Sequence, residues 1–423
     1  MRLPLILACS GLLAVPTSNA VEYRGDATVE GWAFARDGAQ AQSRHDGALR
    51  LQAEIWHRWN DDRDTVTVSP FVRLDGNDSE RTHADLRDAS WTHAGSVAEW
   101  RLGVRQVFWG VTEGTHLVDI INQTDAVESL DGEQKLGQPM LNVSIERNAH
   151  LLDLFMLAGS RERTFPGEDG RLRLPLVVDT ANARYESARE NRRIDLAARW
   201  QLTWQGVRAG LSGFSGTARE PELLPTIDAS RLTYAGGGVP VGFQTGYHPT
   251  LTPYYPVIRQ LGIDAQLTQG DLLWKLEAVR RSGYARGYQA ANAGVEYTQV
   301  GAFGSSLDIG WLAEYLHDSR GRQATTPFEH DVLIGLRLAF NNAASTELLA
   351  SAIVDRRTGE RLLSVEGSHR IGDRVRLAIE LRHFGHTGKP QSAFDYLVQP
   401  DLQRKLRPLA DDDFLRLEAS WFF

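Results

Sequence analysis

The last nine residues, LRLEASWFF (Leu415–Phe423), alternate between apolar and polar side chains with a period of two. One face carries Leu415, Leu417, Ala419, Trp421 and Phe423, and the other carries Arg416, Glu418, Ser420 and Phe422. This alternation predicts a β-strand with two unlike faces, because successive side chains of a strand point in opposite directions. The apolar face needs a cover of protein or lipid, since an uncovered apolar edge strand invites pairing with other chains.

Stretches with the same alternation recur along the whole chain. In residues 48–59, for example, Arg50, Glu54 and Arg58 lie on the polar face. Similar stretches run through residues 98–109, 193–204, 271–281, 305–316, 331–340, 347–355 and 374–384. A helical period of 3.6 would scatter the apolar residues around a cylinder, so the pattern predicts an all-β protein.

Two architectures can cover the apolar faces of so many strands. A soluble β-sandwich buries them against a second sheet, whereas an outer-membrane barrel turns them toward lipid and lines its lumen with the polar faces. Strands of about ten residues are long enough for a tilted crossing of the hydrocarbon layer. Aromatic residues recur near the strand ends, as the interfacial girdles of a barrel require. These residues are Trp59, Trp91, Trp109, Trp204, Tyr315, Phe340 and Trp421.

The links between the predicted strands are alternately short and long. Short links lie at residues 60–64, 94–96, 205–206, 269–270, 301–304, 341–344 and 372–373. Long links lie at residues 36–46, 110–140, 159–191, 216–258, 318–328 and 385–411. Bacterial membrane barrels have this asymmetry, with tight turns on the periplasmic side and long loops outside. The prediction is a transmembrane, antiparallel, up-and-down β-barrel of about 18 strands in the bacterial outer membrane. Counts of 16 or 20 stay open, because residues 231–246 could hold another hairpin.

The N-terminus lies outside this pattern, and the cysteine content and net charge add separate constraints. Residues 1–20 combine Arg2, an apolar run and a Ser18-Asn19-Ala20 ending, which predicts a cleaved secretory signal and a barrel of residues 21–423. Cys9 is the single cysteine, so the mature chain should have no disulfide and no Cys-ligated metal. The net charge of -8 is spread along the chain, which excludes a basic nucleic-acid surface.

Two segments resemble known outer-membrane proteins. The ending resembles the C-terminal signature that the barrel-assembly machinery reads, with Trp421 and Phe423 in the matching positions. Residues 83–125 resemble a region of porin-like outer-membrane barrels of largely unknown function and are reminiscent of alginate-export barrels. The matching residues are Gly103, Arg105, Gln106, Trp109, Gly110, Asp119, Asn122 and Asp125. The usual Pro of this motif is absent, and Asn122-Gln123-Thr124 stands in its place. The resemblance implies a transport barrel without a particular cargo.

The polar face of residues 98–109 carries Arg101, Arg105 and Trp109, which should point into the lumen. The functional interpretation is a constriction that binds or steers anionic groups of a solute. In the alternative, these arginines pair with lumen carboxylates such as Glu54, Asp195 or Glu380 and brace the barrel. The full set of side chains predicted to line the pore adds Arg50, Arg58, Arg199, Arg376 and Arg382, together with Asp119 and Asp125 of the next segment.

Residues 111–140 are the candidate constriction loop. They mix apolar residues such as Leu117 and Ile120 with several carboxylates, and loops of this length in compact structures are usually functional or mobile. We predict that the segment folds into the lumen with Asp119 and Asp125 facing Arg101 and Arg105.

The sequence thus predicts a channel for passive passage or export of small solutes, with anions as one possibility. It needs no cofactor or metal, and its partners would be outer-membrane lipid, the assembly machinery and an export partner in the periplasm or inner membrane. No catalytic signature was found: the chain has no G-x-S-x-G and no H-E-x-x-H motif. A barrel that binds a partner through residues 216–258 and, less favoured, a lipid-modifying enzyme stay open. The transported solute, the direction of transport and the oligomeric state are open as well.

Overall fold

The structure is a computed structural model that describes residues 20–423. The predicted signal segment therefore lies outside the described residues, apart from Ala20.

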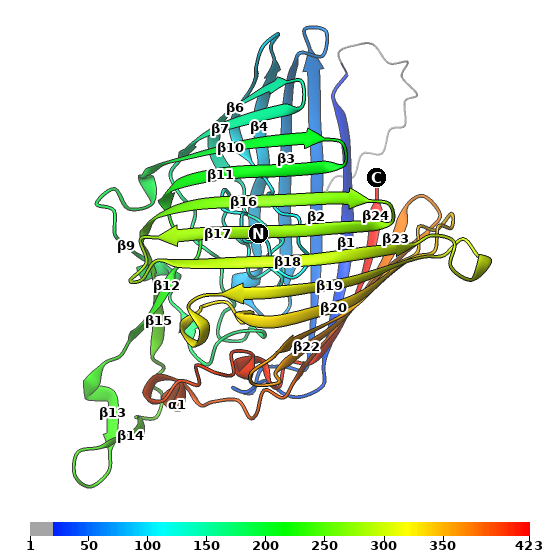
Figure 1. Ribbon diagram of the computed structural model, residues 1–423. Coiled ribbons are helices and arrows are strands. Elements are labelled where there is room, and N and C mark those ends of the chain that lie inside the picture. The colour runs from blue at the N-terminus through cyan, green and yellow to red at the C-terminus, as the bar shows by residue number, and fades with distance from the viewer. Residues whose placement is uncertain (1–19) are drawn as a thin grey trace, which may run out of the picture.

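Eighteen antiparallel strands form one sheet that closes on itself (Figure 1). Each strand pairs with the next, and β1 pairs with both β2 and β24, so the predicted fold class is confirmed. The barrel strands are β1 (Glu22–Phe34), β2 (His45–Trp59), β3 (Asp64–Asp75), β4 (His83–Ala94), β5 (Glu99–Arg105), β6 (Gln138–Arg147), β7 (His150–Ala158), β10 (Ile194–Trp204), β11 (Val207–Thr217), β16 (Val257–Gln269), β17 (Leu272–Ser282), β18 (Tyr288–Gln299), β19 (Asp308–Asp318), β20 (His330–Ala339), β21 (Glu347–Asp355), β22 (Arg361–Ile371), β23 (Val375–Gly385) and β24 (Phe414–Phe422).

The seam between β1 and β24 has the two faces that the sequence of β24 predicts. Leu417 and Trp421 point outward and are exposed, whereas Ser420 is buried inside. The hydroxyl of Thr28 on β1 donates to Ser420 Oγ across the seam at 2.8 Å. Beyond the strand, Phe423 N–H donates to Gly25 O at 3.0 Å and Gly25 N–H donates back at 3.1 Å. The final residue is therefore part of the closure.

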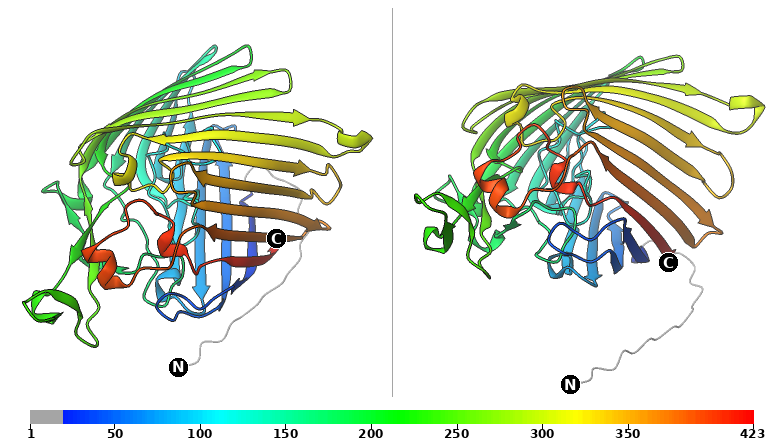
Figure 2. Two further views of the ribbon diagram at one scale, coloured as in Figure 1. Left: turned by 60° about the horizontal axis from the view of Figure 1, so that its bottom comes forward. Right: turned by 90° about the horizontal axis from the view of Figure 1, so that it is seen from below.

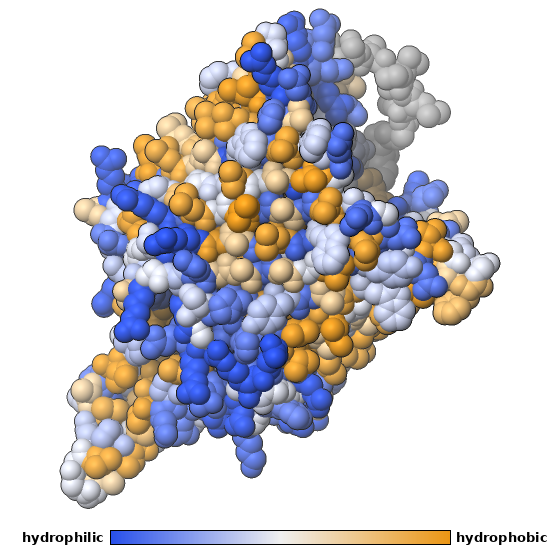
Figure 3. All heavy atoms as spheres, in the orientation of Figure 1, coloured by the Kyte–Doolittle hydropathy of each residue, from blue (hydrophilic) through white to orange (hydrophobic). Residues whose placement is uncertain are grey.

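Apolar side chains cover much of the outer wall, and hydrophilic side chains gather toward its ends (Figure 3). Six of the seven predicted girdle residues lie on the outward face: Trp59, Trp91, Trp204, Phe340 and Trp421 are exposed, and Tyr315 is half-buried there. Trp109 was wrongly assigned to the girdle. The strand that was predicted to reach it ends at Arg105, and Trp109 is buried inside the barrel.

The two ends of the barrel differ. At the turn end, which holds Glu22 and Phe422, the links are residues 60–63, 95–98, 148–149, 205–206, 270–271, 300–307, 340–346 and 372–374. At the loop end, the links are residues 35–44, 76–82, 106–137, 159–193, 218–256, 283–287, 319–329, 356–360 and 386–413. Three of the latter (76–82, 283–287 and 356–360) are short too, so the predicted alternation holds only in part.

Several loops carry structure of their own. The candidate hairpin in residues 231–246 is present as β13 (Leu232–Tyr234) and β14 (Pro240–Phe243), but it lies outside the barrel sheet. A small sheet joins β8 (Val177–Val178), β9 (Arg184–Tyr185), β12 (Glu222–Thr226) and β15 (Thr250–Tyr255). One short α-helix, α1 (Ala393–Val398), lies in the last loop. Among residues 20–423, helices are too short or too polar to span a membrane.

Residues 106–137, here called the inward segment, lie inside the ring of strands, where Figure 2 shows loops filling the interior. Val118, Ile120 and Ile121 of this segment are buried against Phe155 of β7 and Ile258 of β16. The main apolar cluster of the molecule thus joins the inward segment to the inner wall. This confirms the predicted inward folding.

Candidate functional site: the barrel interior

The inward segment begins where β5 leaves the wall. Gly103 has φ of 134° there, and a Cβ at this position would lie 2.2 Å from Ala89 O, so only glycine fits. Gly110 is packed against His116, whose Nδ1 would lie 2.7 Å from an added Cβ. Both glycines belong to the stretch of residues 103–110 that the sequence analysis singled out.

Asn122 holds the two ends of the inward segment together. Its Oδ1 accepts from Val107 N–H at 2.8 Å, and its Nδ2 donates to the carbonyls of Arg105 and Leu136, both at 2.8 Å. A buried backbone without ladder partners needs such hydrogen bonds. Asn122 thus has a structural role, because it joins the start of the inward segment to its end.

Two carboxylates on the far wall satisfy the backbone of residues 111–118. Glu277 of β17 accepts from Val111 N–H at 2.6 Å, from Thr112 N–H at 3.0 Å and from Val118 N–H at 3.2 Å. Glu314 of β19 accepts from the N–H groups of Glu113 and Gly114 at 2.8 and 2.9 Å. The inward segment therefore crosses the lumen from β5 to β17–β19. Sequence reasoning did not single out either carboxylate, although alternation places both on polar faces.

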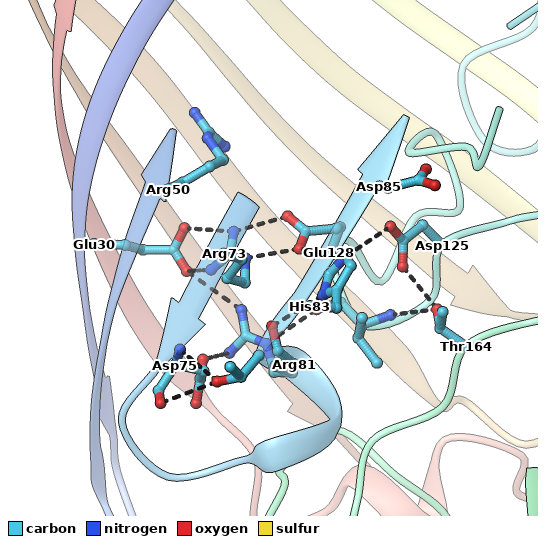
Figure 4. Close-up of polar contacts among 12 residues, drawn as sticks. Glu30, Arg50, Arg73, Asp75, Arg81, His83, Asp85, Asp125, Glu128 and Thr164 are labelled. Carbon is cyan, nitrogen blue, oxygen red and sulfur yellow. Dashed lines mark hydrogen bonds and ion pairs between the residues drawn. The ribbon is translucent and has the colours of Figure 1, made fainter. Parts of the chain in front are cut away.

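A buried ion-pair network fixes the next part of the segment to β1 and β3 (Figure 4). Arg73 donates to both oxygens of Glu30, at 2.9 and 3.2 Å, and to both oxygens of Glu128, at 2.7 and 2.8 Å. Its exposed fraction is 1%. Arg81 adds bonds to Glu30 and to the carbonyl of Val127. One guanidinium therefore links the wall to the inward segment.

Asp125 links the inward segment to β4 and to loop 159–193 (Figure 4). Its carboxylate accepts from Arg87 of β4 at 2.6 Å and from Thr164 of loop 159–193 at 2.7 Å, with His83 Nε2 at 3.4 Å. Burial alone would raise the pKa of Asp125, but its bond with His83 and the Arg87 charge outweigh burial and lower the pKa to about 2. Asp125 is thus an ionised anchor of the segment.

The expected contact of Asp119 and Asp125 with Arg101 and Arg105 is wrong. Asp119 pairs with Lys135 at 3.1 Å, and Asp125 pairs with Arg87. The reason is that the segment turns away from β5 and its own Lys135 lies close to Asp119. Burial raises the pKa of Asp119 despite the Lys135 charge.

Arg101 and Arg105 do lie on the inner wall, together with Trp109. Arg101 pairs with Glu99 and donates to Asn142 Oδ1 at 2.9 Å and to Ser144 Oγ at 2.7 Å. Arg105 donates to Asn142 Oδ1 at 3.2 Å and has no ion pair among the described residues. With Trp109, they line a cavity of about 590 Å³ at the turn end, whose lining includes Arg199.

The remaining predicted residues also lie on inner faces, and each has a partner. The pairs are Arg50 with Asp26 (3.8 Å), Glu54 with Arg24, Arg58 with Glu22 (3.2 Å), Asp195 with Arg219 (3.1 Å), Arg199 with Asp264 (2.7 Å), Arg376 with Glu347 (3.9 Å), and Glu380 with Arg382 and Arg416 (both 2.7 Å). The carboxylates named as partners in the alternative, Glu54, Asp195 and Glu380, pair with other residues, whereas Arg101 does pair with a carboxylate of the inner face, Glu99. The partners lie on the next strand (Asp26 for Arg50), on the same strand (Arg382 for Glu380), two strands away (Asp264 for Arg199) or in a loop (Arg219 for Asp195). Alternation alone does not identify them.

Two cavities adjoin along the wall of β20–β23. One, of about 530 Å³, lies on the loop side. The other, of about 260 Å³, lies toward the turn end, and both are lined by Leu349 and Glu366. At this junction Asp131, at the tip of the inward segment, lies 3.9 Å from Arg382 Nη2. Arg382 also pairs with Glu366 and Glu380. At this junction the tip is therefore close to the β22–β23 wall.

Two clusters of side chains have the spacing of metal ligands among residues 20–423. One is His83, Asp125 and Glu128, where Arg73 and Arg87 already supply the positive charge. The other is Glu329, Asp331 and Asp355, where Lys405 Nζ lies 3.0 Å from Glu329 Oε2. In the first cluster, side-chain cations occupy the place of a counter-ion, whereas in the second one lysine faces three buried carboxylates.

Comparisons with known proteins give a structural similarity only. No protein-family model matches the chain, and no curated protein sequence matches it. The barrel is similar to an engineered variant of the Rhodopseudomonas blastica porin, with a TM-score of 0.43, 10% identity and coverage of 96% of this chain and 100% of that chain. A structure described as "Asymmetric conductivity of engineered proteins" has a TM-score of 0.44, 11% identity and the same coverage. Similarity of this size carries no functional argument.

The Arg73 network generates a stability prediction. Replacing Arg73 with Met leaves Glu30 and Glu128 buried beside an apolar side chain, which should lower the free energy of unfolding by roughly 3–5 kcal/mol. The double variant Arg73→Met/Glu128→Leu should recover most of this loss, because Glu30 keeps Arg81 as a partner. Urea unfolding in lipid vesicles measures both effects. An unstable double variant would show that Arg73 acts through packing.

His116 generates a pH prediction. Burial opposes its protonation, but Glu133 and Glu277, at 3.7 and 3.9 Å, outweigh burial and raise its pKa from 6.5 to about 9. Because the folded pKa is raised, the stabilisation is complete below pH 6.5 and is lost as the pH rises through about 9.

The test compares urea unfolding of the native protein with that of His116→Gln between pH 6 and pH 10. The native protein should be more stable by roughly 1–3 kcal/mol at pH 6, and the difference should disappear above its folded pKa. A difference that is the same at every pH would contradict this role of the His116 charge.

Proposed function

We propose that this protein is a channel of the bacterial outer membrane that lets small solutes pass down their gradient. The observation that carries the proposal is the inward segment. It crosses a closed barrel and approaches the opposite wall at Asp131 and Arg382, leaving cavities on both sides of the junction. A segment fastened in this way would set the size and charge of what passes.

The chemistry of the lumen supports passage of hydrophilic or charged groups. The cavity at the turn end of the β20–β23 wall is lined by the charged side chains of Arg337, Arg376, Glu380, Arg416 and Glu418. Charges of both signs lining a pore discriminate between solutes by charge. The proposal involves no catalytic step and no cofactor. Export with a periplasmic or inner-membrane partner would use the same lumen in the opposite direction.

The first test is single-channel recording of the refolded full-length protein in a planar bilayer. We expect stepwise, steady openings. Asp131→Trp should lower the conductance by roughly a factor of two, because it adds bulk at the junction. Asp373→Trp, which removes the same charge in an exposed turn, should leave the conductance unchanged. A correctly folded barrel without openings would contradict the channel function, and equal conductance of the two variants would place the constriction elsewhere.

A second prediction concerns ion selectivity. The double variant Arg101→Ala/Arg105→Ala should shift the reversal potential in a salt gradient toward cations, because lumen charges act across a narrow, poorly screened space. Arg280→Ala is the control for loss of a positive charge outside the lumen, since Arg280 is exposed on the outer face of β17. If the double variant and Arg280→Ala give the same reversal potential as the native protein, neither arginine sets selectivity.

A further inference from the structure

The cavity of about 530 Å³ has an apolar wall, which is unusual for the inside of a barrel. Leu333 of β20, Ile353 of β21, Leu362 of β22 and Phe384 of β23 stand directly opposite one another in register across four strands. We call these four residues the apolar belt. All four are buried, and all line the cavity.

Loop residues cover most of the apolar belt, whose side chains are 3% to 8% exposed. Leu172, Phe328 and Leu409 pack against the cluster that contains the belt and are themselves partly exposed. Between these loops and the inward segment the cavity stays open, with a volume in the range of small-molecule binding sites. Contact between water and an apolar wall is unfavourable, so an apolar occupant that displaces the water would be favoured there.

The same cavity holds arginines without a carboxylate partner. The guanidinium of Arg163 makes no hydrogen bond and no ion pair with a described residue, and its Nε is buried. Arg173 donates only to the backbone carbonyls of Leu174 and Glu168. Most other cations of the lining are paired, as Lys135 is with Asp119 and Arg382 with Glu366. Arg163 is partly exposed and has no carboxylate at ion-pair distance among the described residues, so its guanidinium is free to pair with an anion.

We propose that this cavity binds the solute and that the solute is an amphipathic carboxylate, with an apolar ring or chain body. The carboxylate would pair with Arg163 of loop 159–193, and the body would lie along the apolar belt. The inference builds on the proposed channel function, because it names the class of solute that would pass the same lumen. On the way to the turn end, the next cation that the solute would meet is Arg382, at the neighbouring junction.

Three probes separate charge from apolar body: 2-naphthoate carries both, its neutral amide carries only the body, and acetate carries only the charge. They are added at the loop side of single channels of the refolded full-length protein. We expect that 2-naphthoate alone produces concentration-dependent current blockades. Equilibrium dialysis against proteoliposomes measures binding in parallel, whether or not the barrel conducts.

Matched variants locate the site. Arg163→Gln and Ile353→Ser should each weaken 2-naphthoate binding roughly tenfold, the usual scale for one charged hydrogen bond or one buried apolar group. The controls are Arg58→Gln, at the turn end, and Val354→Ser, on the outer face of the same strand. Heat-dependent electrophoretic mobility checks that each variant is folded.

The outcomes separate the two proposals. Equal binding of the amide or of acetate would overturn the inference, and so would unchanged binding of 2-naphthoate to Arg163→Gln and Ile353→Ser. A conducting channel that does not bind 2-naphthoate would leave the channel function standing and remove the solute class. Binding by a barrel that never conducts would keep the site and overturn the channel function.

Discussion

Closure of the sheet is the constraint on which the rest of this structure depends. In hydrocarbon, an unpaired backbone N–H or C=O finds no water, so a sheet with free edges is not viable there. The pairing of β1 with β24 removes both edges, and it continues to the last residue through the bonds between Gly25 and Phe423. Once the sheet is closed, alternation leaves each strand one outward and one inward face, and the composition of the two faces follows.

Closure also explains why charge collects inside. The outward faces are mostly apolar, so most charged strand residues point into the lumen, where burial favours a partner. Arg73 with Glu30 and Arg199 with Asp264 are such pairs. Glu277 and Glu314 satisfy the backbone of the inward segment in the same way. The segment can lie inside the barrel because the wall supplies acceptors that a second strand would otherwise provide.

The sequence predicted the closed all-β barrel, the strand faces and the inward segment, because these depend on local periodicity and on link length. Partners could not be predicted, since they depend on contacts between residues far apart in the chain. Asp131 is near Arg382, and Asp125 near Arg87, only because the segment crosses the lumen. Trp109 shows the limit of periodicity. Alternation places it on the lumen side, as observed, but the strand ends at Arg105, so Trp109 lies on the inward segment and not at a strand end.

The interior is asymmetric, and under the proposed channel function this asymmetry bears on selectivity. Along β1–β4 the inward segment is held by dense, compensated ion pairs, which leave little free charge or apolar surface. Along β20–β23 the wall is apolar toward the loop end and charged toward the turn end. A solute entering from the loop side would first meet the apolar belt with Arg163, and then the Arg382 junction. Such an order favours a molecule with an apolar body and one anionic group over a simple ion. A simple ion would gain nothing from the apolar wall, and a neutral apolar molecule would have nothing to offer the guanidinium of Arg163.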